Sequence, residues 1–268
     1  MGRMPTLFVA HGGGPMPLLG VDMKTRAHLE SISSLISPSK PRAVLVVTAH
    51  WEADPVRVMA KARPGMFFDY YGFPAESYEY EFLAEGDPGL AATVKSLLSD
   101  AKIDCDLDAD RDYDHGVFVP GLLAYPKGDV PFVAMSLHAS LDADTHLDIG
   151  RALSPLRDDG VLILASGMSF HNMRKFNSKT QVAGAVFDKA LSDAVMTKTA
   201  STRAHALRHW ATLPDARDAH PREEHLLPLL VAAGATDDRD TPHRIFHDTL
   251  LGAQVSAFHF SSSENNHP

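Results

Sequence analysis

"AVLVVTAHWE" (residues 43–52) is an apolar run that stops at a histidine, His50, and "TLFVAHGGGP" (6–15) stops in the same way at His11. Both runs are continuous rather than alternating, which is typical of strands buried on both faces of a sheet. Similar runs lie at 56–60, 131–137, 161–165 and 254–260. These runs predict a sheet whose central strands are fully buried.

Segments with helical periodicity separate several of these runs, at 87–101, 142–156, 182–196 and 222–234. Strands alternating with helices predict an α/β fold, with a mixed or mainly parallel central sheet flanked by helices on both faces. The composition changes nowhere along the chain. We therefore expect residues 1–260 to form one catalytic domain and 261–268 to form a polar, frayed C-terminal tail.

The composition disfavours several classes of partner. A net charge of −9 without clustered Lys or Arg argues against nucleic acid. No apolar stretch approaches the roughly 20 residues that span a bilayer, and the N-terminus lacks the pattern of a signal peptide. The single cysteine, Cys105, fits a reducing compartment and has acidic neighbours. We expect a cytoplasmic protein in which Cys105 is structural. The number of subunits is not indicated.

The positions of the histidines, 15 in all, point to a site. His11, His50 and His138 each follow a predicted strand, and His171 follows 161–165 after a short turn. Ligands of open α/β sheets bind at the carboxyl ends of strands, and neutral imidazole is the commonest metal ligand. The sequence therefore predicts a metal site at this edge of the sheet.

Three other histidine segments allow more than one interpretation. His115 in "DYDHGVFVP" (112–120) has a glycine beside it that permits close approach. "HPREEHLLPLL" (220–230) carries His225 but lacks the HExxH spacing of zinc proteases, and an acidic first helical turn would explain its acids. The pair His243 and His247 has helical spacing, and we expect it at the edge of a surface helix.

Six motifs occur in the order seen in the class III extradiol ring-cleavage dioxygenases: "LFVAHGGGP", "AVLVVTAHWE", "FDYYGFPAESY", "DHGVFVP", "LILASGMSFHNMR" and "HPREEHLLPLL". Across residues 5–260 the chain most resembles the branch similar to 4,5-DOPA dioxygenases. The resemblance implies an α/β fold around one non-haem divalent metal ion. It also implies Fe(II) for activity, with Zn(II) possible in the purified protein. The expected substrates are O2 and a small catechol, DOPA-like or related, whose ring opens beside its two hydroxyls.

The resemblance also implies roles for five histidines. His11, His50 and His225 resemble the metal ligands of this branch. His171 resembles the catalytic histidine, which in some members approaches the metal as well. His115 is similar to a histidine that assists catalysis by positioning the substrate.

The identity of the third ligand stays open in the sequence. Better-known class III enzymes complete the metal site with a glutamate, and Glu52 and Glu224 each lie near a candidate ligand. For the substrate we expect contacts from Tyr71 and Tyr78, since aromatic faces suit an aromatic ring. Arg174 is expected to meet a substrate carboxylate. Loop packing and simple solvation are the alternatives for these three residues.

Two other functions compete with ring cleavage. A zinc-dependent hydrolase on the same scaffold would use the metal to activate water. A non-catalytic metal-binding protein would instead hold the ion in a closed site of four protein ligands. The glycine-rich turn after His11 and the separate histidine at position 115 favour an open site.

Overall fold

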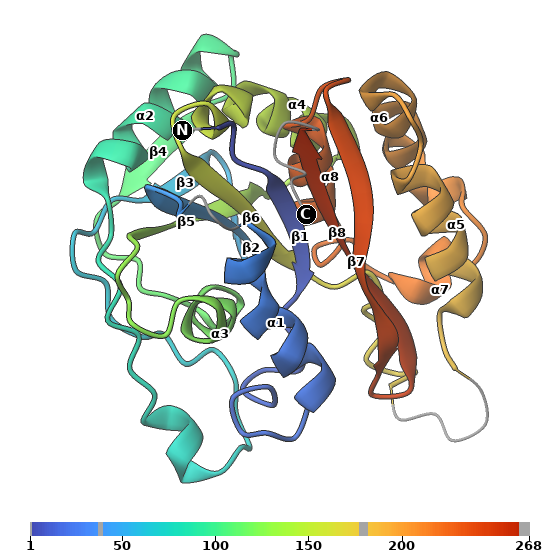
Figure 1. The fold of residues 1–268 in the computed structure, drawn as a ribbon, viewed down its shortest axis with the longest axis horizontal. Coiled ribbons are helices and arrows are strands. Elements are labelled where there is room, and N and C mark those ends of the chain that lie inside the picture. The colour runs from blue at the N-terminus through green and yellow to red at the C-terminus, as the bar shows by residue number, and fades with distance from the viewer. Residues whose placement is uncertain (1, 37–39, 177–181, 263–268) are drawn as a thin grey trace.

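The computed structural model describes residues 2–36, 40–176 and 182–262 (Figure 1). These residues contain one eight-stranded sheet, with strand order β4-β3-β5-β2-β6-β1-β8-β7. The strands are β1 (Thr6–Ala10), β2 (Ala43–Ala53), β3 (Val56–Met59), β4 (Cys105–Asp108), β5 (Phe132–His138), β6 (Val161–Gly167), β7 (Asp240–Leu250) and β8 (Ala253–Ser262).

The sheet is mixed. Its centre is parallel, because β6 pairs in parallel with both β1 and β2, and β2 pairs in parallel with β5. Antiparallel pairing joins β3 to β5, β1 to β8 and β8 to β7. The carboxyl ends of β1, β2 and β6 therefore meet at one edge of the sheet, as the predicted α/β fold requires.

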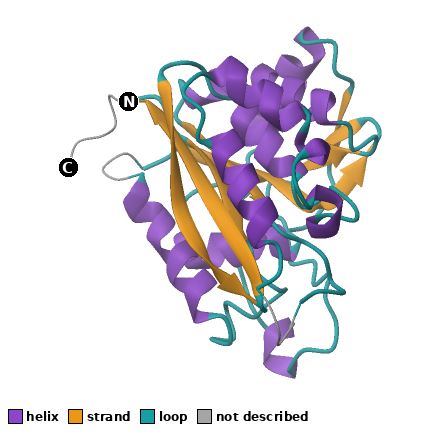
Figure 2. Ribbon diagram, turned by 90° about the vertical axis from the view of Figure 1, so that its right-hand side faces the viewer, coloured by secondary structure: helices purple, strands orange, loops and turns teal. Residues whose placement is uncertain are grey.

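Helices cover both faces of the sheet (Figures 1 and 2). One face packs against α1 (Met23–Leu35) and α3 (His115–Ala124). The other face packs against α2 (Pro88–Asp100), α4 (Ala143–Leu153), α5 (Ala185–Val195), α6 (Ala200–Arg208) and α8 (Leu227–Gly234). Shorter helical segments are η1 (Ala75–Tyr78), η2 (Ser154–Arg157), η3 (Trp210–Thr212) and α7 (Ala216–Ala219).

Strand β1 shows how the sequence builds two cores around one sheet. Phe8 and Ala10 belong to the core on the α8 side, whereas Leu7 and Val9 belong to the core on the α1 side. Successive side chains of a strand point to opposite faces. A strand between two helical layers must therefore be apolar at every position, which is why the run at 6–10 does not alternate.

Three predicted boundaries need correction. Strand β2 does not stop before His50 but continues to Ala53. The helix expected over 222–234 begins only at Leu227, with Pro228 in its first turn, so His225 precedes it. Strand β8 extends to Ser262, because Ser261 and Ser262 pair with β7 rather than fraying. The rest of the expected tail, 263–268, lies outside the described residues.

The segment "TPHRIFHDTL" is a strand, not the edge of a helix. It forms β7, where His243 pairs with His259 and His247 with Ser256 of β8. Strand β7 is an edge of the sheet, and eight of its 11 residues are partly or fully exposed. Its polar composition therefore suits an edge position, although it hides the strand in the sequence.

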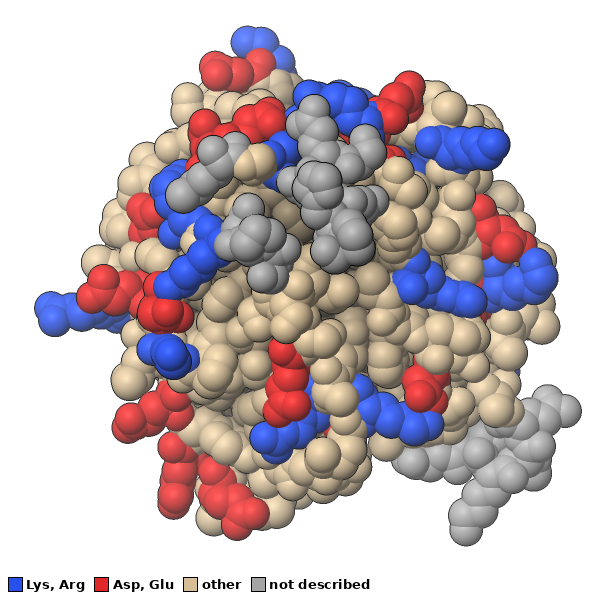
Figure 3. All heavy atoms as spheres, in the orientation of Figure 1, with Lys and Arg blue, Asp and Glu red and all other residues tan. Residues whose placement is uncertain are grey.

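Two further observations concern the helices and the surface. No described helix is long and apolar enough to cross a membrane. On the face shown in Figure 3, basic and acidic side chains are interspersed rather than gathered into a basic patch. Cys105 is buried in β4, and burial raises the pKa of its thiol to about 11, which disfavours a reactive thiolate.

Candidate metal centre

His11 lies at the carboxyl end of β1 and is almost fully buried. Its backbone N–H donates to the carbonyl of Gly167, at the end of β6. The Ser166 hydroxyl donates to the carbonyl of Gly116 and lies 3.0 Å from Nδ1 of His11. Since the hydroxyl proton is already used, the Ser166 oxygen accepts from Nδ1–H. The lone pair of His11 is therefore on Nε2.

His50 lies where the pairing of β2 with β5 changes register, between Val47 and Glu52. Such bulges re-aim a side chain beside a functional site. Its backbone N–H donates to the Thr48 hydroxyl at 3.2 Å. Its Nδ1 lies 3.7 Å from a carboxylate oxygen of Asp69. The irregular strand thus turns the His50 imidazole toward His11, where the two Nε2 atoms are 3.1 Å apart.

His225 comes from the loop before α8. Its carbonyl accepts from the backbone N–H of Met168 at 2.9 Å, which holds it against the end of β6. A Cβ atom at Gly167 would lie 2.2 Å from that same carbonyl, so the close approach needs a glycine there. Nδ1 of His225 donates to Glu224 at 2.8 Å, leaving the lone pair on Nε2.

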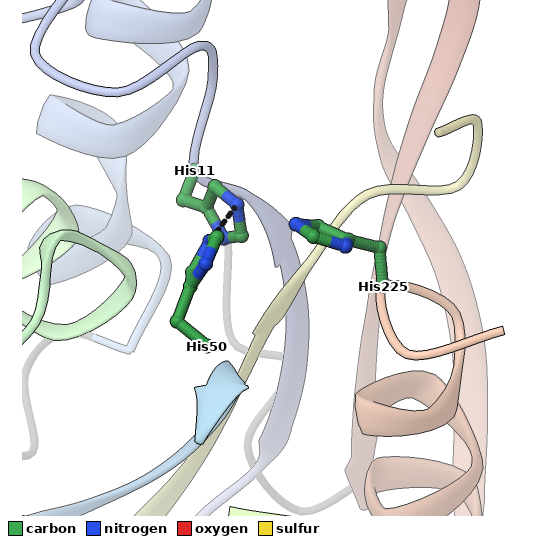
Figure 4. A group of neighbouring side chains, drawn as sticks. All are labelled: His11, His50 and His225. Carbon is green, nitrogen blue, oxygen red and sulfur yellow. Dashed lines mark hydrogen bonds between the residues drawn. The ribbon is translucent and has the colours of Figure 1, made fainter. Parts of the chain in front are cut away.

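The three imidazoles point toward one another from β1, β2 and the loop before α8 (Figure 4). Each offers one ligand atom, and the three atoms lie within 4.8 Å of one another. Two nitrogen ligands about 2.0–2.1 Å from one metal, at bond angles of 90–109°, would be about 2.8–3.4 Å apart. The 3.1 Å separation between His11 and His50 falls in this range. The residues present therefore fit a divalent metal ion.

Burial keeps these three histidines neutral. It lowers the pKa of His11 and His50 well below the ordinary value, and neighbouring imidazoles lower it further. Burial likewise lowers the pKa of His225 to about 4, although Glu224 opposes this effect. Metal ions bind the deprotonated imidazole. At neutral pH the centre therefore needs no proton release before a metal binds.

Glu224 orients two histidines at once. One carboxylate oxygen accepts from His225 and also lies 3.2 Å from Nδ1 of His171. Burial by itself would raise the pKa of Glu224, but the hydrogen bonds from His171 and His225 outweigh it and lower the pKa. The rings of His171 and His225 stack with centroids 3.5 Å apart. One Glu224 oxygen thus contacts the Nδ1 atoms of both His171 and His225.

Glu52 is engaged away from the three histidines. Both of its oxygens accept from Arg222 at 2.6 Å, and Arg222 also lies 3.3 Å from the second oxygen of Glu224. Among the described residues, Glu52 belongs to no group of possible metal ligands. The contacts of Glu52 and Glu224 favour a site of three histidines over one completed by either glutamate.

Asp69 holds His115 beside the centre. It accepts from Nδ1 of His115 at 2.8 Å and from the backbone N–H of His115 at 3.0 Å. Burial would raise the pKa of Asp69, but the bonds from His115 lower it overall. The ring centroid of His115 lies 3.9 Å from that of His50. A Cβ atom at Gly116 would lie 2.6 Å from the Thr48 hydroxyl, which explains the glycine there.

A pocket of about 440 Å³ opens onto the centre. All five clustered histidines line it: His11, His50, His115, His171 and His225. Asp69, three glycines after His11 and a wall of aromatic and aliphatic side chains complete its lining. A site of three protein ligands facing a pocket has coordination positions left for small molecules. This arrangement differs from a closed structural site.

The structure separates the other sequence-predicted residues. Tyr71 lines the pocket, whereas Tyr78 and Arg174 are not among its lining residues. Tyr78 packs against Tyr70, whose ring lines the pocket, and Arg174 is exposed. His138 is not part of the cluster; it contacts Ser140, and its backbone N–H donates to His146.

The position of His138 follows from the register of the sheet. It pairs with Ala53, three residues beyond His50 on the neighbouring strand. At about 3.3 Å per residue, this offset is about 10 Å along the sheet. A histidine at the end of a predicted strand therefore belongs to the site only if it lies at the same height in the sheet as the histidines of the neighbouring strands.

Three residues of the pocket lining were missed in the sequence. Asp69 lies in the aromatic stretch "FDYYG". An acid flanked by aromatic residues was the feature of the sequence that could have indicated its role. Leu250 and Leu251, at the tip of the β7–β8 hairpin, also line the pocket. They gave no signal because β7 itself was not predicted. Leu251 and Gly252 both have positive φ, which is typical of a tight hairpin turn.

Fold and site together define an α/β protein in which three histidines that could hold a metal ion face an open pocket. Residues 4–259 match the family model described as the catalytic LigB subunit of aromatic ring-opening dioxygenase. The chain is 36% identical to the dioxygenase tasH of Hapsidospora irregularis, over 98% of this chain and 87% of that protein. It is 33% identical to a 4,5-DOPA dioxygenase extradiol of Beta vulgaris, over 96% and 97%.

A solved structure supports the same relationship. The crystal structure of an uncharacterized protein from Escherichia coli K12 superimposes with a TM-score of 0.76 at 27% identity. The match covers 96% of this chain and 99% of that one. The chain belongs to the LigB family of aromatic ring-opening dioxygenases. The resemblance seen in its motifs is confirmed, and at the level of the family it is a ring-opening dioxygenase.

Proposed function

We propose that the protein is a non-haem, metal-dependent extradiol dioxygenase that opens a catechol ring beside its two hydroxyls. The observation that carries this proposal is the grouping of five histidines around one pocket. Three of them offer ligand atoms to one point, and the other two are held by carboxylates beside it. Ring cleavage needs both an open metal position and groups that move protons next to it.

The ligands in this proposal are His11, His50 and His225, and the ion in the active protein is Fe(II). When bound, Fe(II) would supply chelation of the two catechol oxygens and electron transfer to O2. Zn(II) suits the same three nitrogens but has no redox chemistry. A zinc-loaded protein would therefore bind catechols without consuming O2.

His171 is the proposed general base and acid. Its Nδ1 faces Glu224, so the other ring nitrogen, Nε2, is free to take the proton of a catechol hydroxyl within the pocket. An imidazole nitrogen can accept a proton and later donate it, which suits a group that acts first as a base and then as an acid. The ring stacks on that of His225, which fixes its distance from the metal ligands.

His115 is the proposed positioning partner on the opposite side. Asp69 accepts from its Nδ1, so Nε2 is available to a substrate oxygen. Tyr71 lines the same pocket and is the proposed aromatic contact for the substrate. These roles predict that loss of His115 weakens productive binding without removing the metal.

The test is O2 consumption by the Fe(II)-reconstituted protein with a panel of catechols. His50→Ala should lose both metal and activity, whereas His171→Ala should keep one metal per chain and lose activity. His138→Ala is the matched control, since it removes a strand-end histidine outside the cluster, and it should behave as wild type. Full metal loading without O2 uptake from any catechol would refute the proposal, and ester hydrolysis by the zinc form would then favour the hydrolase.

A further inference from the structure

The pocket wall beyond the histidines is apolar. It is formed by side chains from four separate segments: Met16, Phe73, Met173, Phe176, Leu250 and Leu251. The Tyr70 ring adds to it, while the Tyr70 hydroxyl donates to the carbonyl of Ser77 and is not offered to a ligand. A substituent on a bound ring would meet methyl, thioether and aromatic groups on this wall.

No Lys or Arg is among the lining residues that the structure describes. Of the cations close to lining residues in the sequence, Lys175 contacts Asp218 and Arg222 contacts Glu52. Arg174, next to the lining residue Met173, is exposed and is not itself part of the lining. Asp69, the carboxylate in the lining, already accepts from His115. A substrate carboxylate inside the pocket would therefore lose water without gaining a cationic partner from the lining, which is unfavourable. This contrasts with the expected role of Arg174.

The volume of the pocket leaves room for a sizeable substituent. An apolar cavity of about 150 Å³ holds a benzene ring. The pocket, at about 440 Å³, therefore has roughly two thirds of its volume left once a catechol ring is bound. That remaining space is bounded by the apolar wall and opens to solvent beside the exposed side chains of Tyr71 and Met173.

We propose that the substrate is a catechol with an uncharged, apolar substituent, alkyl or aryl, rather than an aminocarboxylate side chain. This inference rests on the proposed ring cleavage and narrows its substrate class. The apolar substituent lies against the wall formed by Met16, Phe73 and Leu251, and the two hydroxyls face the histidines.

The test measures binding separately from turnover. Calorimetric titration of the Zn(II)-loaded protein compares catechol with 3- and 4-methyl, ethyl and butyl catechols, and with L-DOPA and 3,4-dihydroxyphenylacetate. In one of the alkyl series affinity should rise about fourfold for each buried methylene. L-DOPA and 3,4-dihydroxyphenylacetate should bind more weakly than unsubstituted catechol. Tighter binding of either charged compound, or no gain with chain length in both series, would overturn the proposal.

A pair of variants tests the missing cation. Met173→Arg adds a guanidinium at the mouth of the pocket, and Met196→Arg makes the same change at an exposed methionine on another surface. Met173→Arg should strengthen binding of 3,4-dihydroxyphenylacetate about two- to fivefold, as expected for an exposed ion pair, and Met196→Arg should not. Equal effects of the two variants would count against the proposal.

Oxygen uptake separates the two levels of inference. If the Fe(II) protein consumes O2 with unsubstituted catechol but prefers L-DOPA, the dioxygenase function stands and the apolar substrate class is wrong. If it consumes O2 with none of the catechols, both are wrong. Uptake that is fastest with the alkyl or aryl catechols, in the order of their affinities, supports both.

Discussion

Glu224 should set the affinity of the centre for its metal, although it is not one of the three proposed ligands. Its carboxylate accepts from Nδ1 of His225 at 2.8 Å and contacts Nδ1 of His171 at 3.2 Å. Only His225 of this pair is a proposed ligand. Glu224→Ala removes the acceptor that keeps the His225 proton on Nδ1 and its lone pair on Nε2.

The expected loss of metal affinity in Glu224→Ala follows from its effect on one proposed ligand, His225. Removing a partner of this kind typically weakens metal binding 10–100-fold, or about 1.4–2.7 kcal/mol. In Glu224→Gln an amide oxygen still accepts from His225 but carries no charge. Hydrogen bonds to a charged group are roughly twice as strong as neutral ones. Half of the loss would then remain, which is about three- to tenfold.

Competition for Zn(II) with a chromophoric chelator at pH 7.5 measures both variants. Glu223→Gln is the matched control, because Glu223 pairs with the exposed Arg217 outside the cluster. It should bind zinc as wild type does. If all three variants bound zinc equally, the orienting role of Glu224 would be refuted. If Glu223→Gln were as weak as Glu224→Gln, the effect would lie in the fold of this loop instead.

Three further predictions concern stability and packing. Burial lowers the pKa of His28 to about 4. Between pH 6.5 and 4 the unfolded state therefore binds one proton that the folded state does not, and the free energy of unfolding decreases by about 1.4 kcal/mol for each unit by which the pH is lowered. In pH-dependent unfolding, His28→Gln should lose that share of the slope, and an unchanged slope would contradict it. Asp240→Asn leaves the buried Arg157 guanidinium without its anion and should cost about 3–5 kcal/mol in urea unfolding, against less than about 1 kcal/mol for the exposed Asp193→Asn. Gly116→Ala places a Cβ atom 3.1 Å from the His50 ring and should weaken zinc binding, whereas wild-type affinity would show that the ring can shift freely.

The residues that the sequence located best are those at the ends of central strands. β1, β2 and β6 are apolar on both faces, so their ends are visible as the point where polar residues begin. His11 and His171 were located in this way. The edge strand β7 was missed because one edge of it faces solvent and its histidines at i and i+4 imitate a helix.

The acceptors behind the histidines were harder to predict than the histidines themselves. Glu224 was visible, but its spacing did not distinguish a metal ligand from a partner of His225. Asp69 lies between β3 and η1, outside any helix or strand, so no periodicity places it. Only the folded chain shows that its carboxylate reaches His115. Sequence periodicity reports burial, whereas hydrogen-bond partners depend on how loops return to the sheet.

The distance along the chain between the proposed ligands explains why these hydrogen-bond acceptors matter for function. His11 follows β1, His50 lies in β2, and His225 lies in a loop more than 200 residues from the N-terminus, so no local segment could hold their rings at one point. Each ring is fixed instead by a contact to its Nδ1 side, from Ser166, Asp69 or Glu224. Asp69 and Glu224 each contact a second histidine that is not a proposed ligand, His115 or His171. The same two carboxylates therefore couple the proposed metal site to the groups proposed to move and position protons, and a change at either should alter metal affinity and turnover together.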